Sequence, residues 1–289
     1  METEETISNW GQLCSDEMTP PDIFGSGRPL NRESFTIRIF LTTLSLLTLY
    51  ALFTMDYQGV DIARATADTF HSFKIVFMEP STQRLGLWNA FYEVLVTMGL
   101  AFLSTLFGGV IALFLGLLSA QNLAPRWVTG CIKSFVAFIR AIPTILWVLI
   151  FAVAAGLGSA AAVIGMTFHS ISYLTKAYSE SFEELDRNVI EALSASGANW
   201  WQIVFQAVIP SSAAYLLSWT FMRFEINFAN AIAMGAAAGA AGIGFDLFMA
   251  GGYYFDLKEV GLITYIVLAF AIVLEMIATH MKSNIHQKT

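Results

Sequence analysis

The sequence predicts an all-α integral membrane protein with about six transmembrane helices. Composition is the first observation: 56% of the 289 residues are hydrophobic and only 13% are charged, whereas soluble proteins carry roughly 25% charged residues. The second observation is that the apolar residues gather in runs of about 20 or more, the length that an α-helix needs to cross a bilayer. The net charge of −7, without a basic stripe, argues against a nucleic-acid-binding protein.

Six apolar runs are long enough to form transmembrane helices, at residues 35–55, 91–120, 128–155, 159–178, 210–238 and 260–281. The third run contains Arg140 and Pro143, and the fifth contains Arg223, Glu225, Asn227 and Asn230. Lys and Arg are more frequent in the segments on the side of the two termini. The positive-inside rule therefore predicts that both termini are cytoplasmic.

Polar stretches divide the rest of the chain. Residues 1–33 are rich in Asp and Glu and contain three prolines, so they predict a flexible cytoplasmic arm ahead of the first transmembrane helix at 34–55. In the external loop 56–88, apolar residues between Phe70 and Phe77 have helical spacing. They predict a helix, either on the outer membrane surface or packed as an ordinary loop helix. The remaining divisions are a core at 89–281 and a cytoplasmic tail at 282–289.

The cytoplasmic segment 179–208 has the pattern of two short helices joined by a glycine. Residues 180–195 are charged on one side and apolar on the other. Gly197 is the expected stop of the first helix, and Asn199 with Gln202 forms the pattern of an N-terminal cap for the second. Pro210 is expected to open the next helix. Such a bent pair suits docking into another protein, although an interfacial linker with two Trp residues has the same pattern.

Polar residues within the expected spans are candidates for a translocation path. An Arg at mid-bilayer costs roughly 2.5–3.5 kcal/mol on insertion scales, so Arg140 and Arg223 should face protein or water. Arg223, Asn227 and Asn230 are spaced by four and three residues, which places them on one helix face. They predict, together with Arg140, a path for an anion. A structural pair between Arg and Glu225 is the alternative.

Other polar and small residues support more ordinary roles. His169 and Ser170 fall within a span and predict a hydrogen bond between helices. The glycine-rich run 235–244 has no lysine and no preceding strand, so it is not a phosphate-binding loop. Gly235 and Gly239 predict close helix packing, or alternatively a lining of the path. The scattered histidines have no metal-ligand spacing, and no metal site is expected.

Several stretches together resemble a known family. Glu191, Ala192, Gly197 and Pro210 have the spacing of the EAA motif of ABC importer permeases, from which the chain departs at Leu193, Ala207 and Ile209. The chain is further similar to phosphonate permeases in five stretches: SAQNLAPR (119–126), FIRAIPTILWVLIFAVAAGLG (138–158), HSISYLTKAYSESFEELD (169–186), RFEIN (223–227) and GAAGIGFDL (239–247).

This resemblance implies a type I ABC importer permease fold in a bacterial inner membrane. It implies that Glu191, Ala192, Gly197 and Pro210 belong to a cytoplasmic coupling helix that seats in an ATP-binding subunit. The implied assembly is a homodimer with ATP-binding subunits inside, which hold ATP and Mg, and an extracytoplasmic solute-binding protein outside. This chain would then bind no cofactor and perform no catalysis. The implied cargo is phosphonate or a related oxyanion such as phosphate or phosphite.

Two rival functions remain at this point. A permease of the same kind for another small solute, such as an amino acid, would have the same motif. A self-contained secondary transporter would need coupling-ion sites, usually with paired carboxylates near the midplane. Glu225 is the single acid that the sequence places deep in an expected span.

Overall fold

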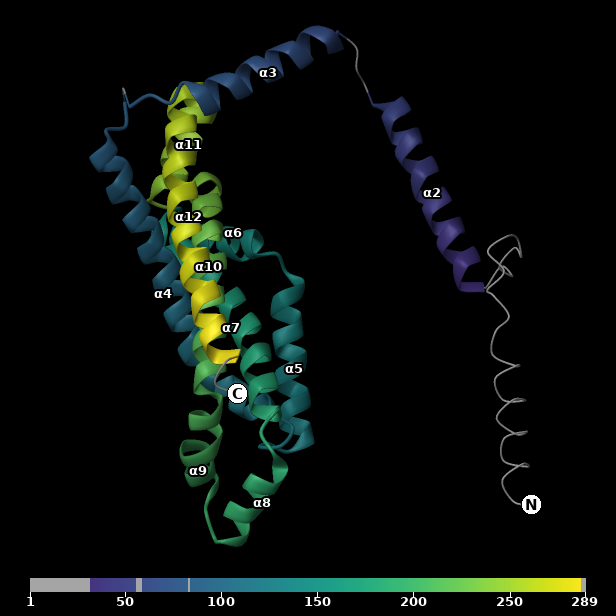
Figure 1. Ribbon diagram of the computed structural model, residues 1–289, viewed down its shortest axis with the longest axis vertical. Coiled ribbons are helices and arrows are strands. Elements are labelled where there is room, and N and C mark those ends of the chain that lie inside the picture. The colour runs from purple at the N-terminus through teal and green to yellow at the C-terminus, as the bar shows by residue number, and fades with distance from the viewer. Residues whose placement is uncertain (1–31, 56–58, 83, 287–289) are drawn as a thin grey trace, which may run out of the picture. The chain divides into compact units, whose positions relative to one another are not determined.

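The computed structural model describes residues 32–55, 59–82 and 84–286, and all regular elements in these residues are helical. The expected arm at residues 1–33 falls almost wholly outside the described residues. The chain divides into two compact units, one ending at Ile62 and the other beginning at Ala63. The first unit contains α2 (Arg32–Thr54), at the place where the first transmembrane helix is expected (Figure 1).

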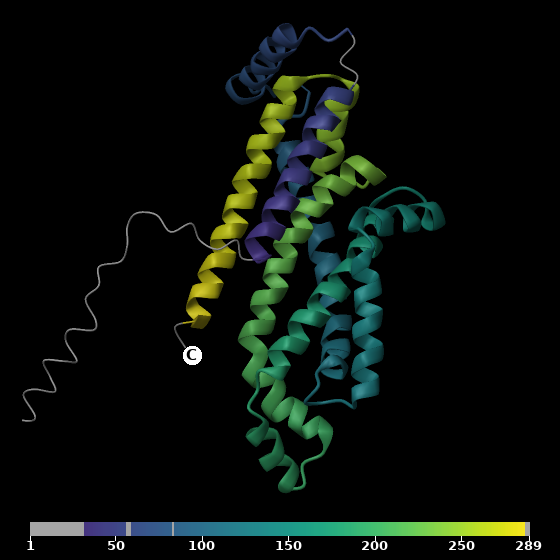
Figure 2. The same cartoon turned by 90° about the vertical axis from the view of Figure 1, so that its right-hand side faces the viewer.

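The second unit is a bundle of long helices with short helices at its two ends (Figures 1 and 2). It holds nearly all of α3 (Ile62–Met78), then α4 (Leu87–Ser119), α5 (Arg126–Ala141), α6 (Thr144–Ala155), α7 (Ser159–Glu183), α8 (Arg187–Ala195), α9 (Trp200–Ile203), the π-helical turn η1 (Val204–Val208), α10 (Ile209–Ala238), α11 (Ile243–Phe248), the π-helical turn η2 (Met249–Tyr253) and α12 (Leu257–His286).

The centre of the bundle is the packing of α4, α7 and α10. Small residues of α4 face α7, and a side chain added at Gly108 would come within 2.5 Å of the Cβ atom of Ser170. Apolar side chains from all three helices, such as Val94, Met166 and Phe228, form the largest buried cluster. Close contact through small residues is the usual way in which helices associate in lipid, where burial of apolar surface gives little driving force.

The expected helix in the loop 56–88 is α3. Its C-terminal end is fixed to the start of α12, because Glu79 forms an ion pair with Lys258 at 2.9 Å and the Tyr265 hydroxyl donates to the Phe77 carbonyl at 2.6 Å. This contact orders the end of the loop. A position of α3 on the outer membrane surface stays a prediction.

Residues 128–155 do not form the single continuous span that the sequence indicates. They form α5 and α6, which meet at an angle of 85°. The break occurs at Pro143, since the helical region is disfavoured for a residue before proline, and Ile142 is extended with φ −94° and ψ 121°. The Trp147 indole N–H donates to the Ile139 carbonyl at 3.1 Å, which satisfies one acceptor that the break frees.

The number of possible spans follows from helix length and hydropathy. Among the described residues, α2, α4, the helical run Trp200–Ala238 and α12 meet both criteria, and α5 with α6 makes a fifth if the bent pair is one span. The expected span 159–178 lies within the 25-residue helix α7. Serines, threonines and charged residues lower its hydropathy, and many of its side chains are buried inside the bundle.

The segment 179–208, called the coupling segment from here on after its expected role, agrees with the sequence at its turn but not at its ends. Gly197 has φ +86°, and Asn199 with Gln202 forms the expected capping box, with hydrogen bonds of 2.9 and 2.7 Å. The first helix begins at Arg187 rather than near residue 180, because α7 continues to Glu183 and the Asp186 side chain caps the next helix by accepting from the Asn188 N–H at 2.9 Å.

Pro210 is the second residue of α10, as expected for a proline that opens a helix. However, α9, η1 and α10 follow one another without a break, so the helical run extends from Trp200 to Ala238. Proline lacks the N–H that a regular helix needs, and its ring clashes with the carbonyl four residues earlier. The π turn η1 (Val204–Val208) lies immediately before this position. Its wider turn accommodates Pro210 without ending the helix.

The glycine-rich run behaves in two ways. Gly235 gives the expected close packing, because a side chain there would come within 2.7 Å of the Phe245 backbone nitrogen. Gly239 does not pack closely, since nothing lies within 4 Å of an added Cβ. It instead ends α10 in the left-handed conformation with φ +60°, a conformation that glycine adopts at low cost.

Candidate functional site

Arg223 and Asn227 meet where α10 packs against α4 and α7. The Arg223 Nε atom donates to the Ser170 hydroxyl at 3.1 Å. The Asn227 amide donates to the same hydroxyl and to the Thr105 hydroxyl, both at 2.8 Å. Both side chains are buried, Arg223 being 1% exposed and Asn227 fully covered. One hydroxyl of α7 thus joins two of the predicted path residues.

The charge of Arg223 has no carboxylate partner among the described residues. No ion pair of Arg223 occurs among the residues whose side chains are described, and its Nη2 atom and the Asn227 oxygen are buried without hydrogen-bond partners. The Tyr173 ring lies 5.4 Å from the guanidinium carbon, a cation–π contact that stabilises the charge only in part. A buried charge normally needs a partner, so this arrangement favours an anion beside Arg223.

The structural Arg–Glu pair, which the sequence left as an alternative, does not form among the described residues. Glu225 follows Arg223 by two residues along α10 and interacts with Glu275 of α12. It therefore points toward another carboxyl rather than toward either arginine.

The four predicted path residues do not form one cluster. Asn230, one turn beyond Asn227, is half-buried and lies outside the hydrogen-bond network of Ser170. Arg140 is exposed near the end of α5 and lines a cavity between α5 and α7. His169 lies within electrostatic reach of both Arg223 and Arg140. One histidine of α7 is therefore near both arginines.

Sequence reasoning identified Ser170 only as a residue that would bond between helices, which is confirmed. His169 differs, since its Nδ1 atom is buried without a partner. Thr105 and Tyr173 were missed. Only the packing of α4, α7 and α10 brings Thr105 to the Asn227 amide and Tyr173 to the Arg223 guanidinium, so the pattern within one helix did not indicate them.

The second candidate region is the coupling segment, α8 and α9 (Figure 1). No residue of α8 is buried, and Glu191 and Ala192 are exposed on it. The base of the segment is fixed, because the Trp200 indole donates to the Leu123 carbonyl at 3.0 Å. Trp201 and Phe205 are more than half exposed. The arrangement is a protruding pair of helices with a rigid base and exposed apolar side chains, as a docking surface requires.

Comparison with known proteins identifies the family. The profile of the binding-protein-dependent transport system inner membrane component family matches residues 112–289. The chain belongs to this family. The matched range begins within α4 and includes the coupling segment, Ser170, Arg223 and Asn227. It leaves out α2 and α3.

Relatives within this transport family include two curated permeases. The phosphate-import permease PhnE of Mycolicibacterium smegmatis is 28% identical over 58% of this chain and 32% of its own length. The phosphite transport permease PtxC of Stutzerimonas stutzeri is 30% identical over 60% of this chain and 62% of its own length. The chain thus spans about a third of the first of these two relatives and about three fifths of the second.

A solved structure shows the same fold. In the inward-facing MetNI methionine ABC transporter, a chain that is 21% identical superposes with a TM-score of 0.60 over 68% of this chain and 95% of that chain. The type I ABC permease fold expected from the sequence is therefore confirmed.

Proposed function

We propose that this chain is the permease subunit of an ATP-driven ABC importer for phosphonate or a related oxyanion such as phosphate or phosphite. The names of the relatives support this cargo class. The structural observation that carries it is Arg223, a buried cation without a carboxylate partner among the described residues. Moving an anion through a low-dielectric region is costly unless a charge compensates it.

The main alternative cargo is a zwitterionic amino acid. An amino acid needs an acceptor for its ammonium group as well as a cation for its carboxylate. The groups around Arg223 are the hydroxyls of Ser170 and Thr105, the Asn227 amide and the Tyr173 ring. None of these carries a negative charge, so the site favours an anion.

The proposed assembly has a second copy of this chain, ATP-binding subunits at the cytoplasmic face and an extracytoplasmic solute-binding protein, in the bacterial inner membrane with both termini cytoplasmic. ATP and Mg belong to the ATP-binding subunit. Glu191, Ala192, Gly197 and Pro210 form or adjoin the surface that contacts it. This chain binds no cofactor of its own in the proposed cycle.

The structure supports a direct connection between ATP hydrolysis and the anion path. The helix that begins in the coupling segment at Trp200 continues through η1 into α10 and carries Arg223. The distance along this helix is about 35 Å at 1.5 Å per residue. A movement of the coupling segment therefore reaches Arg223 through one continuous element, without an intervening loop.

Reconstitution tests the proposal. Proteoliposomes containing the permease, the ATP-binding subunit and the binding protein should take up labelled phosphate, phosphite or methylphosphonate when ATP is enclosed with the ATP-binding subunit. Methionine should not be taken up. The permease alone should neither hydrolyse ATP nor accumulate solute.

A secondary transporter is the alternative that needs a separate experiment. Glu225 and Glu275 interact within the candidate spans, and a proton-coupled transporter uses such carboxylates. Uptake by the permease alone under a proton gradient would replace the ABC proposal by a secondary carrier. ATP-driven uptake of methionine, with no uptake of any oxyanion, would support an ABC importer but reject an oxyanion as its cargo.

A further inference from the structure

A polar cavity lies between α5 and α7, toward the end of the bundle that carries α8. Its volume is about 220 Å³. The helices contribute three basic residues to its lining, Lys133, Arg140 and Lys176, and two acidic residues, Glu180 and Glu183. Apart from Arg140, none of these residues was singled out as a site in the sequence.

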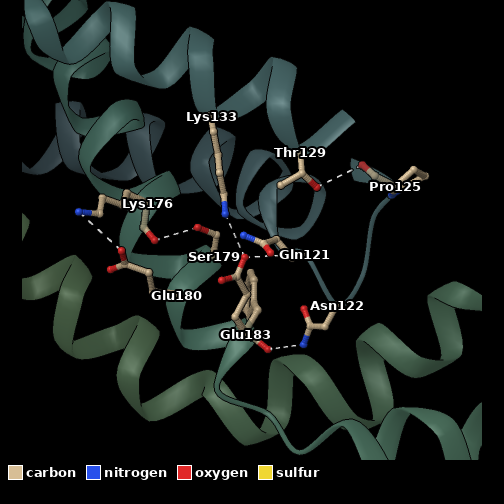
Figure 3. A network of polar contacts seen from close by, with 10 residues as sticks. Gln121, Asn122, Pro125, Thr129, Lys133, Lys176, Ser179, Glu180 and Glu183 are labelled. Atoms are coloured by element: carbon tan, nitrogen blue, oxygen red, sulfur yellow. Dashed lines mark hydrogen bonds and ion pairs between the residues drawn. The ribbon is translucent and has the colours of Figure 1, made fainter. Parts of the chain in front are cut away.

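Two of the three cations are already paired, as Figure 3 shows. Glu183 accepts from Lys133 at 3.2 Å and from the Gln121 backbone N–H at 2.9 Å. Lys176 pairs with Glu180 at 3.6 Å within one helical turn. Arg140 has no ion pair among the residues whose side chains are described. The lining therefore has one surplus positive charge, and it lies on Arg140.

The buried wall of the cavity supplies hydroxyl groups. Thr175 is 1% exposed, and its Oγ1 atom is buried without a hydrogen-bond partner. Ser119 and Ser179 also line the cavity and are each 2% exposed. An unpaired buried hydroxyl is costly, so the Thr175 hydroxyl should have a partner other than the described residues of this chain.

We propose that this cavity binds a tetrahedral phosphorus oxyanion, with the Arg140 guanidinium as its charge partner and the Thr175 hydroxyl as a donor. A guanidinium donates two parallel hydrogen bonds to such an oxyanion, and a neighbouring hydroxyl adds a third. The volume corresponds to roughly seven water molecules at about 30 Å³ each, enough for an anion of this size with part of its hydration.

The position of the cavity relates it to Arg223. His169 lies within electrostatic reach of Arg223 and of Arg140, and Lys176 follows two turns further along the same helix. Positive or polar groups therefore continue from the buried site to the cavity beside the coupling segment. If the bound anion is the transported solute, the cavity is its last site before release into the cytoplasm. This reading rests on the transport function proposed above. The same chemistry suits the phosphate of a lipid headgroup.

Binding to the purified full-length permease, without its ATP-binding subunit, tests the site directly. Isothermal titration with inorganic phosphate and with methylphosphonate, at constant ionic strength, should give saturable binding. Arg140→Gln should weaken it by at least about tenfold, because it removes the charge partner of the anion and the hydrogen bonds that this charge strengthens. Thr175→Val, which keeps the shape, should weaken it by about threefold. Arg126→Gln is the matched control, because Arg126 is an exposed arginine of the same helix outside the cavity, and it should bind as the wild type does.

A second arm identifies the source of the phosphate group. Native mass spectrometry should compare retention of phosphatidylglycerol with that of a phosphate-free galactolipid. Loss of phosphatidylglycerol in Arg140→Gln, without any binding of free anions by the wild type, supports the site with a lipid as its occupant. The site is overturned if Arg140→Gln binds the free anions and phosphatidylglycerol as well as the wild type does. It is also overturned if the wild type binds neither kind of ligand saturably.

Uptake by the complete transporter separates this inference from the proposed function. If the complete transporter takes up oxyanions normally and Arg140→Gln does not change that uptake, the cavity is rejected as a site of the cargo, and the importer is left intact. Absence of oxyanion uptake by the wild type rejects the importer, while an Arg140-dependent affinity for phosphate in the purified chain still supports the site.

Discussion

The coupling segment and the Arg223 site differ in how their geometry is specified. In the coupling segment, Gly197 and the capping box of Asn199 and Gln202 lie within six consecutive residues. At the Arg223 site, the contacts join α4, α7 and α10 across up to 122 positions of sequence. The first is therefore determined by local backbone chemistry and the second by packing in three dimensions.

This difference predicts different responses to mutation. A change in the coupling segment should alter its shape and its docking while the bundle remains assembled. A change at Arg223 should alter the environment of an anion while the coupling segment keeps its shape. Four experiments, ordered by expected effect, can separate these responses.

The largest effect is expected for Arg223→Gln. This substitution removes the buried charge but keeps a hydrogen-bond donor near Ser170. Oxyanion uptake should fall by about 10- to 100-fold, consistent with ~1.5–3 kcal/mol for hydrogen bonds to a charged group, while ATP-binding subunits are still captured in a pull-down. Arg223→Lys should retain part of the uptake. Dissociation of the complex would assign Arg223 a structural role, and unchanged uptake would place it outside the path.

A smaller effect is expected for Gly197→Asp, because Gly197 has φ +86° and a non-glycine residue in the left-handed region costs about 1–2 kcal/mol. Asp tolerates this region better than most residues, so uptake and stimulation of the ATPase should fall by about fivefold. The control is Gly86→Asp, at an ordinary φ of −59° with nothing within 4 Å of an added Cβ. Wild-type coupling in the Gly197 variant would reject the docking role.

Ser170→Ala should have an effect of about threefold on uptake, because it removes one neutral hydrogen-bond partner from Arg223 and Asn227. Combined with Asn227→Ala, its effect should be clearly less than additive, since the two residues belong to one network. Combined with Gly197→Asp, the effects should simply multiply. Strong coupling between Ser170 and Gly197 would contradict the separation of the two regions.

The smallest effect concerns Asp246 of α11, between the candidate spans. Burial and the nearby carboxylates of Glu93 and Glu259 raise its pKa to about 6. Because the fold favours the protonated form, its stability should decrease as pH rises through 6 and change little further above it. Asp246→Asn should therefore raise the melting temperature in detergent by about 2–4 °C at pH 8 and by less at pH 5. An equal change at both pH values would show that Asp246 does not titrate there.

The sequence was informative where the determinant is a local rule. The αL turn at Gly197 and the capping box follow from residue types that adopt those conformations at low cost. The pairing of Arg223 with Asn227 followed from helical spacing, which fixes the face of one helix. The identity of the opposing helix was not predictable, so Thr105 and Tyr173 were missed and Glu225 was considered as a partner for arginine.

Two prolines, Pro143 and Pro210, show the limit of local rules. Pro143 bends the chain by 85° between α5 and α6, whereas Pro210 lies within a continuous helix. Sequence reasoning placed one span across Pro143 and expected Pro210 to open a new helix. Pro210 does lie at the start of α10, but without a break from the helical run before it. The difference lies in the residue before each proline: Ile142 is extended, whereas Ile209 stays helical directly after the π turn η1.

The π turn η1 also fixes the rotational setting of the coupling segment about the axis of α10. A π turn contains one more residue than the α-helical path it replaces, and each residue of an α-helix turns the chain by about 100°. If this turn were a regular α-helix, Trp201 and the rest of the coupling segment would be rotated by about 100° about the helix axis. Arg223 would keep its position. The number of residues between Gly197 and Pro210 therefore sets the direction in which the docking surface faces. Deletion of one residue there should turn this surface away from its partner without shortening the bundle.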